Sequence, residues 1–385
     1  MRTLSVGEIT FNATRYQAVM MGIQERSIKP LEAMMMAMVT KDVDTSTALT
    51  EEDRHLIERK ATLRRKAFAD NTWAGYKSDL LSFIRYAGTD LPFPVTSTLI
   101  ENYLITKSEE LAPSTLRHHV AALSFVHRFL DAEDPTAGPV IQQILSGIRK
   151  ERLDEGWEQK RAPALTADQV KQVIMAIEDD MRGLRDRTLF LVGLVCAFRQ
   201  NELSKLQIED LTKVDGEGYS YKVKRSKTDQ EGTKNRYKVI PYGKGKMCPV
   251  KAIDELLDEM GEDTGPLFRG ISRSGNFMLS KNTDGSDSRK GMSHTAVNAV
   301  IRKRINLAGI ITETDPDKHK AKLKAYSFHT LRSTFITILR AGDVADSKIM
   351  KQTHHTNINI IEMYDRPEMH FKGNPASDLM AALIE

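Results

Sequence analysis

Seven residues between position 199 and the C-terminus have side chains that suit one kind of chemistry together. They occur in the order Arg199, Glu202, Lys227, His329, Arg332, His355 and Tyr364. Arginine presents a planar fork of N–H donors that matches phosphate oxygens and keeps its charge. The set includes no cluster of carboxylates, which a metal-dependent nuclease would require. The residue types therefore favour attack on a phosphodiester without a metal ion.

Each of these features has an ordinary structural explanation when it is taken alone. Arg199 and Glu202, three residues apart, suit a helical ion pair. Lys227 lies near a predicted turn, where an exposed lysine mainly serves solubility. The three-residue spacing of His329 and Arg332 places both on one helical face. A single tyrosine such as Tyr364 is usually a packing residue, so only the ordered combination is informative.

The combination suggests a division of labour. Two arginines would stabilise the additional charge of a pentacoordinate transition state, as Mg²⁺ does in other enzymes. A tyrosine hydroxyl would be the covalent nucleophile, and the phosphotyrosine would preserve the bond energy. A lysine would give a proton to the leaving oxygen.

The chain resembles the tyrosine recombinase (phage integrase) family over about residues 54–385. The resemblance rests on Arg-Gln-Asn-Glu from position 199, Arg-Ser-Lys-Thr around Lys227, His-Thr-Leu-Arg from position 329, and the segment from His355 to Tyr364. It implies that Arg199, Lys227, His329, Arg332 and His355 are catalytic. It also implies that Tyr364 is the nucleophile and that Glu202 braces Arg199.

Two residues depart from the family pattern. Many members have glycine immediately before the position of His355, where this chain has His354. Phe328 precedes His329 at a position that is small in a related recombinase. We expect changes in the local turn and packing, without loss of a reactive group.

The resemblance also implies a fold and a partner. The expected fold is mainly α with a small antiparallel β-sheet, arranged as a two-domain clamp of a helical core-binding domain and an integrase-type catalytic domain. The expected substrate is double-stranded DNA with inverted-repeat recombination sites. It would be recombined through a Holliday junction by a homotetramer that is monomeric in solution. No cofactor and no metal are expected, and the apolar helix near the C-terminus would pack into a neighbouring protomer.

The elements that must position these residues divide the chain into four parts. We predict an N-terminal arm over 1–50, a helical DNA-binding domain over 51–150, a charged linker over 151–163 and the catalytic domain over 164–385. In the last part, residues 188–198 form a strongly apolar, buried helix. Alternating residues over 219–242 predict a β-hairpin, and residues 270–291 predict an exposed loop.

The segment from Ser114 to Leu130 predicts an amphipathic helix. Leu116, Val120, Leu123, Val126 and Leu130 share one face at 100° per residue. The opposite face has the residue types that lie in a major groove, although an ordinary surface helix fits equally well. The predicted DNA-binding residues, here and elsewhere, are Ser114, Thr115, Arg117, His118, Arg128, Lys77, Arg149, Lys150, Arg225 and Lys324.

Composition agrees with a polyanionic partner. The 385 residues have a net charge of +4, and between positions 222 and 246 nine basic residues face two acidic ones. A second basic cluster spans 318–324. The two cysteines cannot form a disulfide framework, and no signal peptide or membrane-spanning run is present. We expect a cytoplasmic, nucleoid-associated protein.

Two alternatives remain open. One is a phage-type integrase that needs accessory factors, although residues 1–50 are short for a separate arm-binding domain. The other is a non-catalytic DNA-binding relative, which would not require this set of reactive residues.

Overall fold

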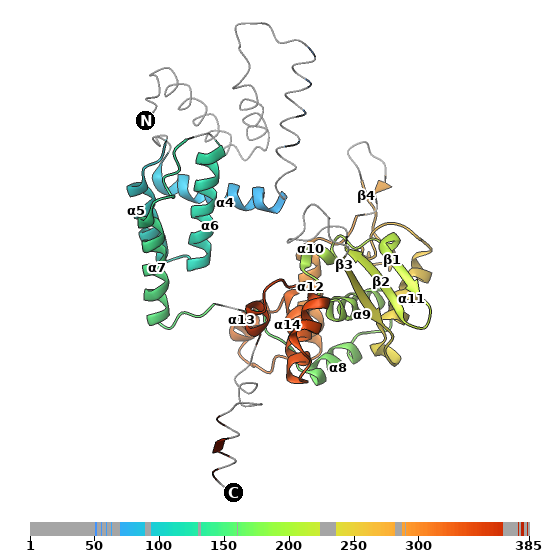
Figure 1. The fold of residues 1–385 in the computed structure, drawn as a ribbon. Coiled ribbons are helices and arrows are strands. Elements are labelled where there is room, and N and C mark those ends of the chain that lie inside the picture. The colour runs from blue at the N-terminus through green and yellow to red at the C-terminus, as the bar shows by residue number, and fades with distance from the viewer. Residues whose placement is uncertain are drawn as a thin grey trace. The chain divides into compact units, whose positions relative to one another are not determined.

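The computed structural model describes residues 70–88, 94–129, 132–159, 161–223, 236–281, 287–288 and 290–364, with isolated positions nearer both ends. The chain divides into two compact units, Met1–Gln159 and Lys160–Glu385 (Figure 1). Lys227, Arg225 and the predicted arm over 1–50 lie outside the described residues.

The first unit is helical throughout its described part. Its helices are α4 (Asp70–Ala87), α5 (Ser97–Ser108), α6 (Pro113–Phe129) and α7 (Pro139–Asp154). The Thr96 hydroxyl caps α5 by accepting a hydrogen bond from the Leu99 N–H at 3.3 Å, which satisfies one free donor of the first turn. Helix α4 packs on α6, and α5 packs on α7.

The predicted apolar face of α6 is confirmed where it is described. Leu116, Val120, Leu123 and Val126 are all buried in the core of this unit. Leu130 lies outside the described residues. Burial of one side of α6 leaves its polar side at the surface, as required for a helix that contacts DNA.

The second unit is also mainly helical. Its α-helices are α8 (Ala167–Met175), α9 (Met181–Val195), α10 (Gln200–Leu203), α11 (Pro249–Met260), α12 (His294–Leu307), α13 (Pro316–Ala325), α14 (His329–Ala341), α15 (Asp346–Thr353) and α16 (Asn359–Glu362). Two short 3₁₀ turns are η1 (Ile208–Asp210) and η2 (Gly245–Met247). A capping box starts α8: the Thr166 hydroxyl accepts from the Gln169 N–H, and the Gln169 side chain accepts from the Thr166 N–H.

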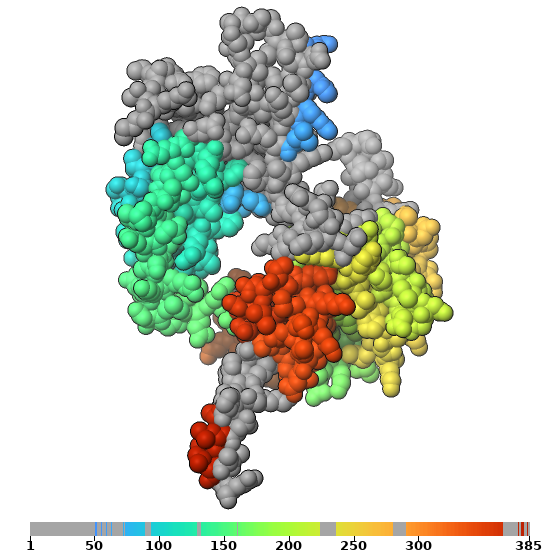
Figure 2. All heavy atoms as spheres, viewed as in Figure 1, coloured from blue at the N-terminus to red at the C-terminus, as the bar shows by residue number. Residues whose placement is uncertain are grey.

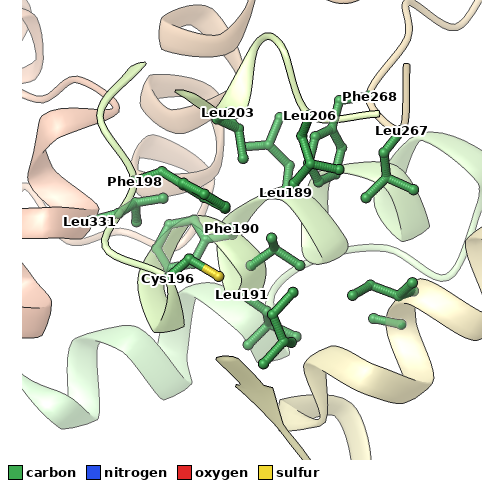
Figure 3. Close-up of a cluster of buried hydrophobic side chains, with 14 of the residues drawn as sticks. Leu189, Phe190, Leu191, Cys196, Phe198, Leu203, Leu206, Leu267, Phe268 and Leu331 are labelled. Atoms are coloured by element: carbon green, nitrogen blue, oxygen red, sulfur yellow. The ribbon is translucent and has the colours of Figure 1, made fainter. Parts of the chain in front are cut away.

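The core of the second unit is built around α9. The predicted apolar helix is buried, since Leu189, Phe190, Leu191 and Val192 are at most 2% exposed. Its predicted bounds are wrong, because α9 begins at Met181 and ends at Val195, not at Phe198. Figure 3 shows Leu189, Phe190 and Leu191 in one cluster with Phe198, which follows the helix. Helix α9 contacts α11, α14 and strand β3, so α14, which carries His329 and Arg332, packs on this central helix.

A three-stranded antiparallel sheet covers part of this core. Strands β1 (Leu211–Val214), β2 (Gly218–Val223) and β3 (Arg236–Pro241) occur in the order β1-β2-β3. The predicted pairing of two strands is confirmed, with Tyr221 opposite Lys238. The faces of β3 differ from the sequence pattern, because Tyr237 and Val239 are exposed while Lys238 and Ile240 point inward.

The segment over 270–291 is more regular than predicted. Strands β4 (Ser280–Lys281) and β5 (Asp287–Ser288) pair in it as a short antiparallel ladder. Among the described residues, no helix is long and apolar enough to cross a membrane. The predicted fold class, mainly α with a small antiparallel sheet, is confirmed.

Candidate active site

Six of the seven predicted catalytic residues lie on neighbouring turns of the second unit. Arg199 precedes α10, His329 and Arg332 occupy the first turn of α14, and His355 follows α15. Tyr364 comes two residues after α16 ends. Helix α14 packs on α9 and α15, and α15 packs on β3. The surface formed by residues 329–364 is orange to red in Figure 2.

Glu202 holds Arg199 through two contacts. Its carboxylate accepts from the Arg199 N–H at 3.0 Å and from Arg199 Nη1 at 3.1 Å. Burial raises the pKa of Glu202, but the charges of Lys238 and Arg199 and the backbone hydrogen bond outweigh this effect and leave the pKa below its usual value. Glu202 is therefore ionised at neutral pH and fixes the orientation of Arg199.

Arg332 is almost completely buried, at 1% exposed. Its Nη1 donates to the Ala197 carbonyl at 2.6 Å, and its Nη2 donates to the Thr353 carbonyl at 2.8 Å. Burial and the nearby charge of Arg199 lower its pKa to about 10, so it remains charged at neutral pH. Arg332 thus joins the segment before Arg199 to the end of α15.

His355 accepts a hydrogen bond from Arg332. Arg332 Nη2 lies 2.6 Å from His355 Nε2, and a guanidinium can only donate. The proton of the imidazole is therefore on Nδ1, which donates to the Thr353 hydroxyl at 3.0 Å, and that hydroxyl donates to the Ile349 carbonyl at 2.9 Å. Burial and the charges of Arg332 and Arg199 lower the pKa of His355 to about 3.

The hydroxyl of Tyr364 lies 3.1 Å from His329 Nε2. Burial raises the pKa of Tyr364, while the charge and hydrogen bond of Arg332 oppose the rise. Desolvation and the charges of Arg332 and Arg199 lower the pKa of His329. A neutral tyrosine beside a neutral imidazole is an arrangement in which the imidazole can accept the phenolic proton.

His354 accounts for the first departure from the family pattern. It ends α15 in the left-handed conformation, with φ +56°, which glycine adopts most easily. Its Nε2 donates to the Tyr237 carbonyl of β3 at 3.2 Å. The imidazole therefore adds a contact with the sheet that glycine could not make, although the turn itself is the one that favours glycine.

Two residues near this cluster were not singled out in the sequence. Lys238 is 0% exposed, and its Nζ donates to the carbonyls of Cys196 and Gln352, each at 2.8 Å. Arg161 donates through Nη1 to the carbonyl of Met363, next to Tyr364. In the sequence, Lys238 is one residue of the basic cluster over 222–246, and Arg161 is one residue of the charged segment over 151–163. No motif marks either residue.

The predicted DNA-binding residues are spread over several helices. On α6, Ser114, Arg117 and His118 are exposed and Thr115 is partly buried. His118 forms a short contact with Asp79 of α4, and Arg128 lies 3.7 Å from Asp134. Lys77 on α4 is half-buried, whereas Arg149 and Lys150 on α7 and Lys324 on α13 are exposed.

The sequence of this chain is similar to those of known recombinases. Residues 163–370 match the sequence model of the Phage integrase family. An integrase/recombinase XerD homolog of Selenomonas ruminantium is 28% identical over 360 residues, covering 91% of this chain and 96% of the relative. The Cre recombinase of Escherichia phage P1 is 23% identical over 310 residues, covering 78% and 85%.

Solved structures show the same fold. A lambda integrase dimer bound to a core site matches with a TM-score of 0.51 and 18% identity, covering 86% of this chain and 81% of that chain. A post-cleavage complex of XerH with a palindromic difH substrate matches with a TM-score of 0.51 and 14% identity, covering 92% and 96%. The family match spans more than half of the sequence, and the chain belongs to the Phage integrase family of tyrosine recombinases.

Proposed function

We propose that this protein is a site-specific DNA recombinase that cleaves and rejoins DNA through a 3′-phosphotyrosine at Tyr364. The observation that carries the proposal is the position of the Tyr364 hydroxyl. It lies 3.1 Å from His329 Nε2, and the charge and hydrogen bond of Arg332 favour its ionised form. A base, a hydroxyl nucleophile and two guanidinium groups in one site are the parts that phosphoryl transfer requires.

The proposed step is a transesterification, in which one phosphoester bond replaces another. The Tyr364 oxygen bonds to phosphorus and transfers its proton towards His329, while the bond from phosphorus to the 5′ oxygen breaks. That oxygen leaves with a proton from Lys227. Arg199, oriented by Glu202, and Arg332 neutralise the non-bridging oxygens. The step needs no ATP, because the phosphotyrosine preserves the energy of the broken phosphodiester bond. Attack by a 5′ hydroxyl on the phosphotyrosine reverses these events on the partner strand.

We propose that His355 acts first on Arg332 and not on the phosphate. Its Nε2 accepts from Arg332, so in this arrangement it orients the guanidinium rather than donating to phosphate. A donor role at Nε2 would require the proton to move from Nδ1 and Arg332 to turn away.

We propose further that the substrate is double-stranded DNA with inverted-repeat sites and that four protomers bring two sites together. Two rounds of strand exchange would pass through a Holliday junction. Membership of the Phage integrase family supports this assembly, as does the exposed polar side of α6, which includes Arg117 and His118. The domain over 164–385 would perform the chemistry, and the helical domain over 51–150 would contact the DNA.

Covalent capture tests the proposal. The purified protein is incubated in EDTA with nicked inverted-repeat duplexes of varied arms and spacers, and the denatured, protease-treated complexes are examined by mass spectrometry and sequencing. We expect a nucleotide adduct on Tyr364 and none in Tyr364→Phe, which should bind DNA with unchanged affinity. Tyr242→Phe, which removes the hydroxyl of an exposed tyrosine, is the matched control and should form the adduct.

The other outcomes separate the alternatives. Strand cleavage by Tyr364→Phe would refute the nucleophile assignment. Tight, salt-sensitive binding by the wild type without an adduct would favour a non-catalytic relative, or an integrase that needs accessory factors; adding a host-cell extract would then distinguish these two.

A further inference from the structure

Two helix ends meet behind the candidate active site. Helix α9 ends at Val195 and α15 ends at Thr353. The last carbonyl groups of a helix lack partners inside it and carry partial negative charge. The structure places the carbonyls that follow α9 near those that end α15, and cationic side chains lie between them.

Two buried cations bridge successive pairs of these carbonyls. Arg332 joins the carbonyls of Ala197 and Thr353, at 2.6 and 2.8 Å. Lys238 joins the preceding pair, Cys196 and Gln352, at 2.8 Å each. The arginine comes from α14 and the lysine from β3, so the same two helix ends are held from two directions.

Gln352 adds a third link. Its side-chain Nε2 donates to the Val195 carbonyl at 2.9 Å and to the Val239 carbonyl of β3 at 2.9 Å. Together with Lys238, it ties the end of α9, strand β3 and the end of α15 into one assembly. Arg199 lies four residues after the end of α9, and His355 lies two residues after the end of α15.

The ammonium group of Lys238 is in a costly place. The residue is 0% exposed, and burial of a charge is unfavourable unless hydrogen bonds compensate. Its nearest carboxylate oxygen, Glu202 Oε2, is 4.0 Å away. Burial lowers its pKa to about 8, opposed by Glu202 and reinforced by Arg332 and Arg199. An apolar side chain would fill the same space without the cost of burying a charge. What Lys238 adds is therefore its two hydrogen bonds to main-chain carbonyls.

The bonds of Arg332 explain why a second bridge is useful. Both hydrogens of Nη2 are taken, one by the Thr353 carbonyl and one by His355 Nε2. A guanidinium contacts phosphate in a bidentate way either through Nε and Nη2 or through Nη1 and Nη2, so both geometries use Nη2. Arg332 must therefore release one of these two bonds to bind phosphate in this way. Release of Thr353 would weaken one of the two bridges.

We propose that Lys238 is a positioning residue, whose ammonium group keeps the Arg199 turn and the His355 turn together while Arg332 engages the scissile phosphate. This inference rests on the proposed function, because it assigns phosphate binding to Arg332. Lys238 itself touches no substrate. It acts by keeping the two turns at the distance found in the free protein.

The test compares Lys238→Met, Lys238→Arg and the control Lys171→Met. Lys171 is an exposed lysine on α8 and lies outside both basic clusters. The probe is the nicked duplex recovered by covalent capture with the wild type. We expect Lys238→Met to bind this duplex with affinity within about twofold of wild type and to form the adduct about 10- to 100-fold more slowly, since small misplacements of reacting groups have effects of this size. Lys238→Arg should recover most of the rate, because its fork reaches two carbonyls, and Lys171→Met should match wild type.

If Lys238→Met does not fold, Lys238→Gln provides the same test, because it removes the ammonium charge and keeps a polar side chain. We expect its adduct to form about fivefold more slowly with unchanged DNA affinity. Wild-type rates in the folded variant would overturn the proposal, and so would a lowered rate that Lys238→Arg fails to raise.

A second readout needs no DNA and separates this inference from the proposed function. Amide hydrogen exchange over 196–203 and 350–355 should be at least about tenfold faster in the Lys238→Met or Lys238→Gln variant than in wild type, with α11 unchanged. If the wild type forms no adduct, the proposed function fails and the exchange data alone decide whether Lys238 holds the two turns. Unchanged exchange in both segments would show that it does not.

Discussion

At the residue scale, His355 links the chemistry of the site to the pH dependence of its stability. The folded protein keeps this imidazole neutral, because burial, Arg332 and Arg199 lower its pKa to about 3. In the unfolded chain the pKa of a histidine is about 6.5. As the pH falls from 6.5 towards 3, the unfolded chain binds a proton that the folded protein does not, so stability is full above pH 6.5 and is lost below it.

We therefore expect His355→Gln to lose less stability than wild type between pH 6.5 and pH 4.5. The glutamine amide oxygen can still accept from Arg332, but it does not ionise. Urea unfolding at several pH values measures the difference, and the other histidines contribute equally to both proteins. His294→Gln, at the start of α12, is the control and should follow the wild-type curve. Parallel curves for His355→Gln and wild type would contradict the assignment.

The residues of the site differ in how well the sequence reveals them. Arg199, His329, Arg332 and Tyr364 stand in motifs whose residue types suit phosphate chemistry, and the structure brings them together. Lys238 has no such pattern. It occupies an inward position of β3, flanked by two exposed apolar residues, so the strand's alternation indicates the wrong face. Its partners are main-chain carbonyls, which the sequence does not identify.

At the element scale, the packing of α9 against α14 explains the second departure from the family pattern. Phe328 is 0% exposed. A methyl group added at Gly193 of α9 would lie 2.7 Å from Phe328 Cε2 and 2.7 Å from Leu331 Cδ1. Gly193 therefore makes room for the bulky ring before His329. The sequence showed the large residue but not the glycine that accommodates it, because the two are brought together only by helix packing.

We expect Gly193→Ala to destabilise the second unit by about 1–3 kcal/mol, the usual cost of overpacking a core. Alanine is otherwise favoured over glycine in a helix by about 1 kcal/mol. Gly147→Ala on α7, where the added methyl group meets nothing within 4 Å, should accordingly stabilise the first unit. Urea unfolding with probes in each unit measures both changes.

A double variant provides the sharper check of this contact. Phe328→Ala removes the ring, so Gly193→Ala should be much less harmful in that background. We expect a coupling energy between the two substitutions of about 0.5–3 kcal/mol, the range for residues in contact. Additive effects would show that Gly193 does not make room for Phe328.

At the scale of the whole molecule, the two units divide the proposed work. The first unit has its own core, centred on residues such as Phe83, Tyr103 and Leu116, and the second contains the candidate active site. Composition and periodicity predicted helices in both and one hairpin in the second. The division falls between Gln159 and Lys160, and α7 continues to Asp154, within the segment predicted as a linker. Residues 151–154 have three charged side chains and one exposed leucine, Leu153, so no apolar periodicity indicates that they extend α7.

The C-terminal segment supplies the prediction that concerns assembly. Leu379, Met380 and Leu383 are helical and 55–70% exposed in the single chain. Burial of such side chains contributes about 1.5–3 kcal/mol each, so a neighbouring protomer that covered them would gain enough affinity to favour assembly. A chain ending at Pro375 should therefore bind a single site with affinity within about twofold of wild type but form paired-site complexes at least about tenfold less well.

Gel-shift titration on one-site and two-site duplexes measures both quantities. Replacing the three apolar residues with serine in the full-length chain should reproduce the loss, because it removes the apolar contact and keeps the chain length. An equal loss of single-site binding would place the segment on its own unit instead. Unchanged assembly in both variants would show that these side chains do not join protomers.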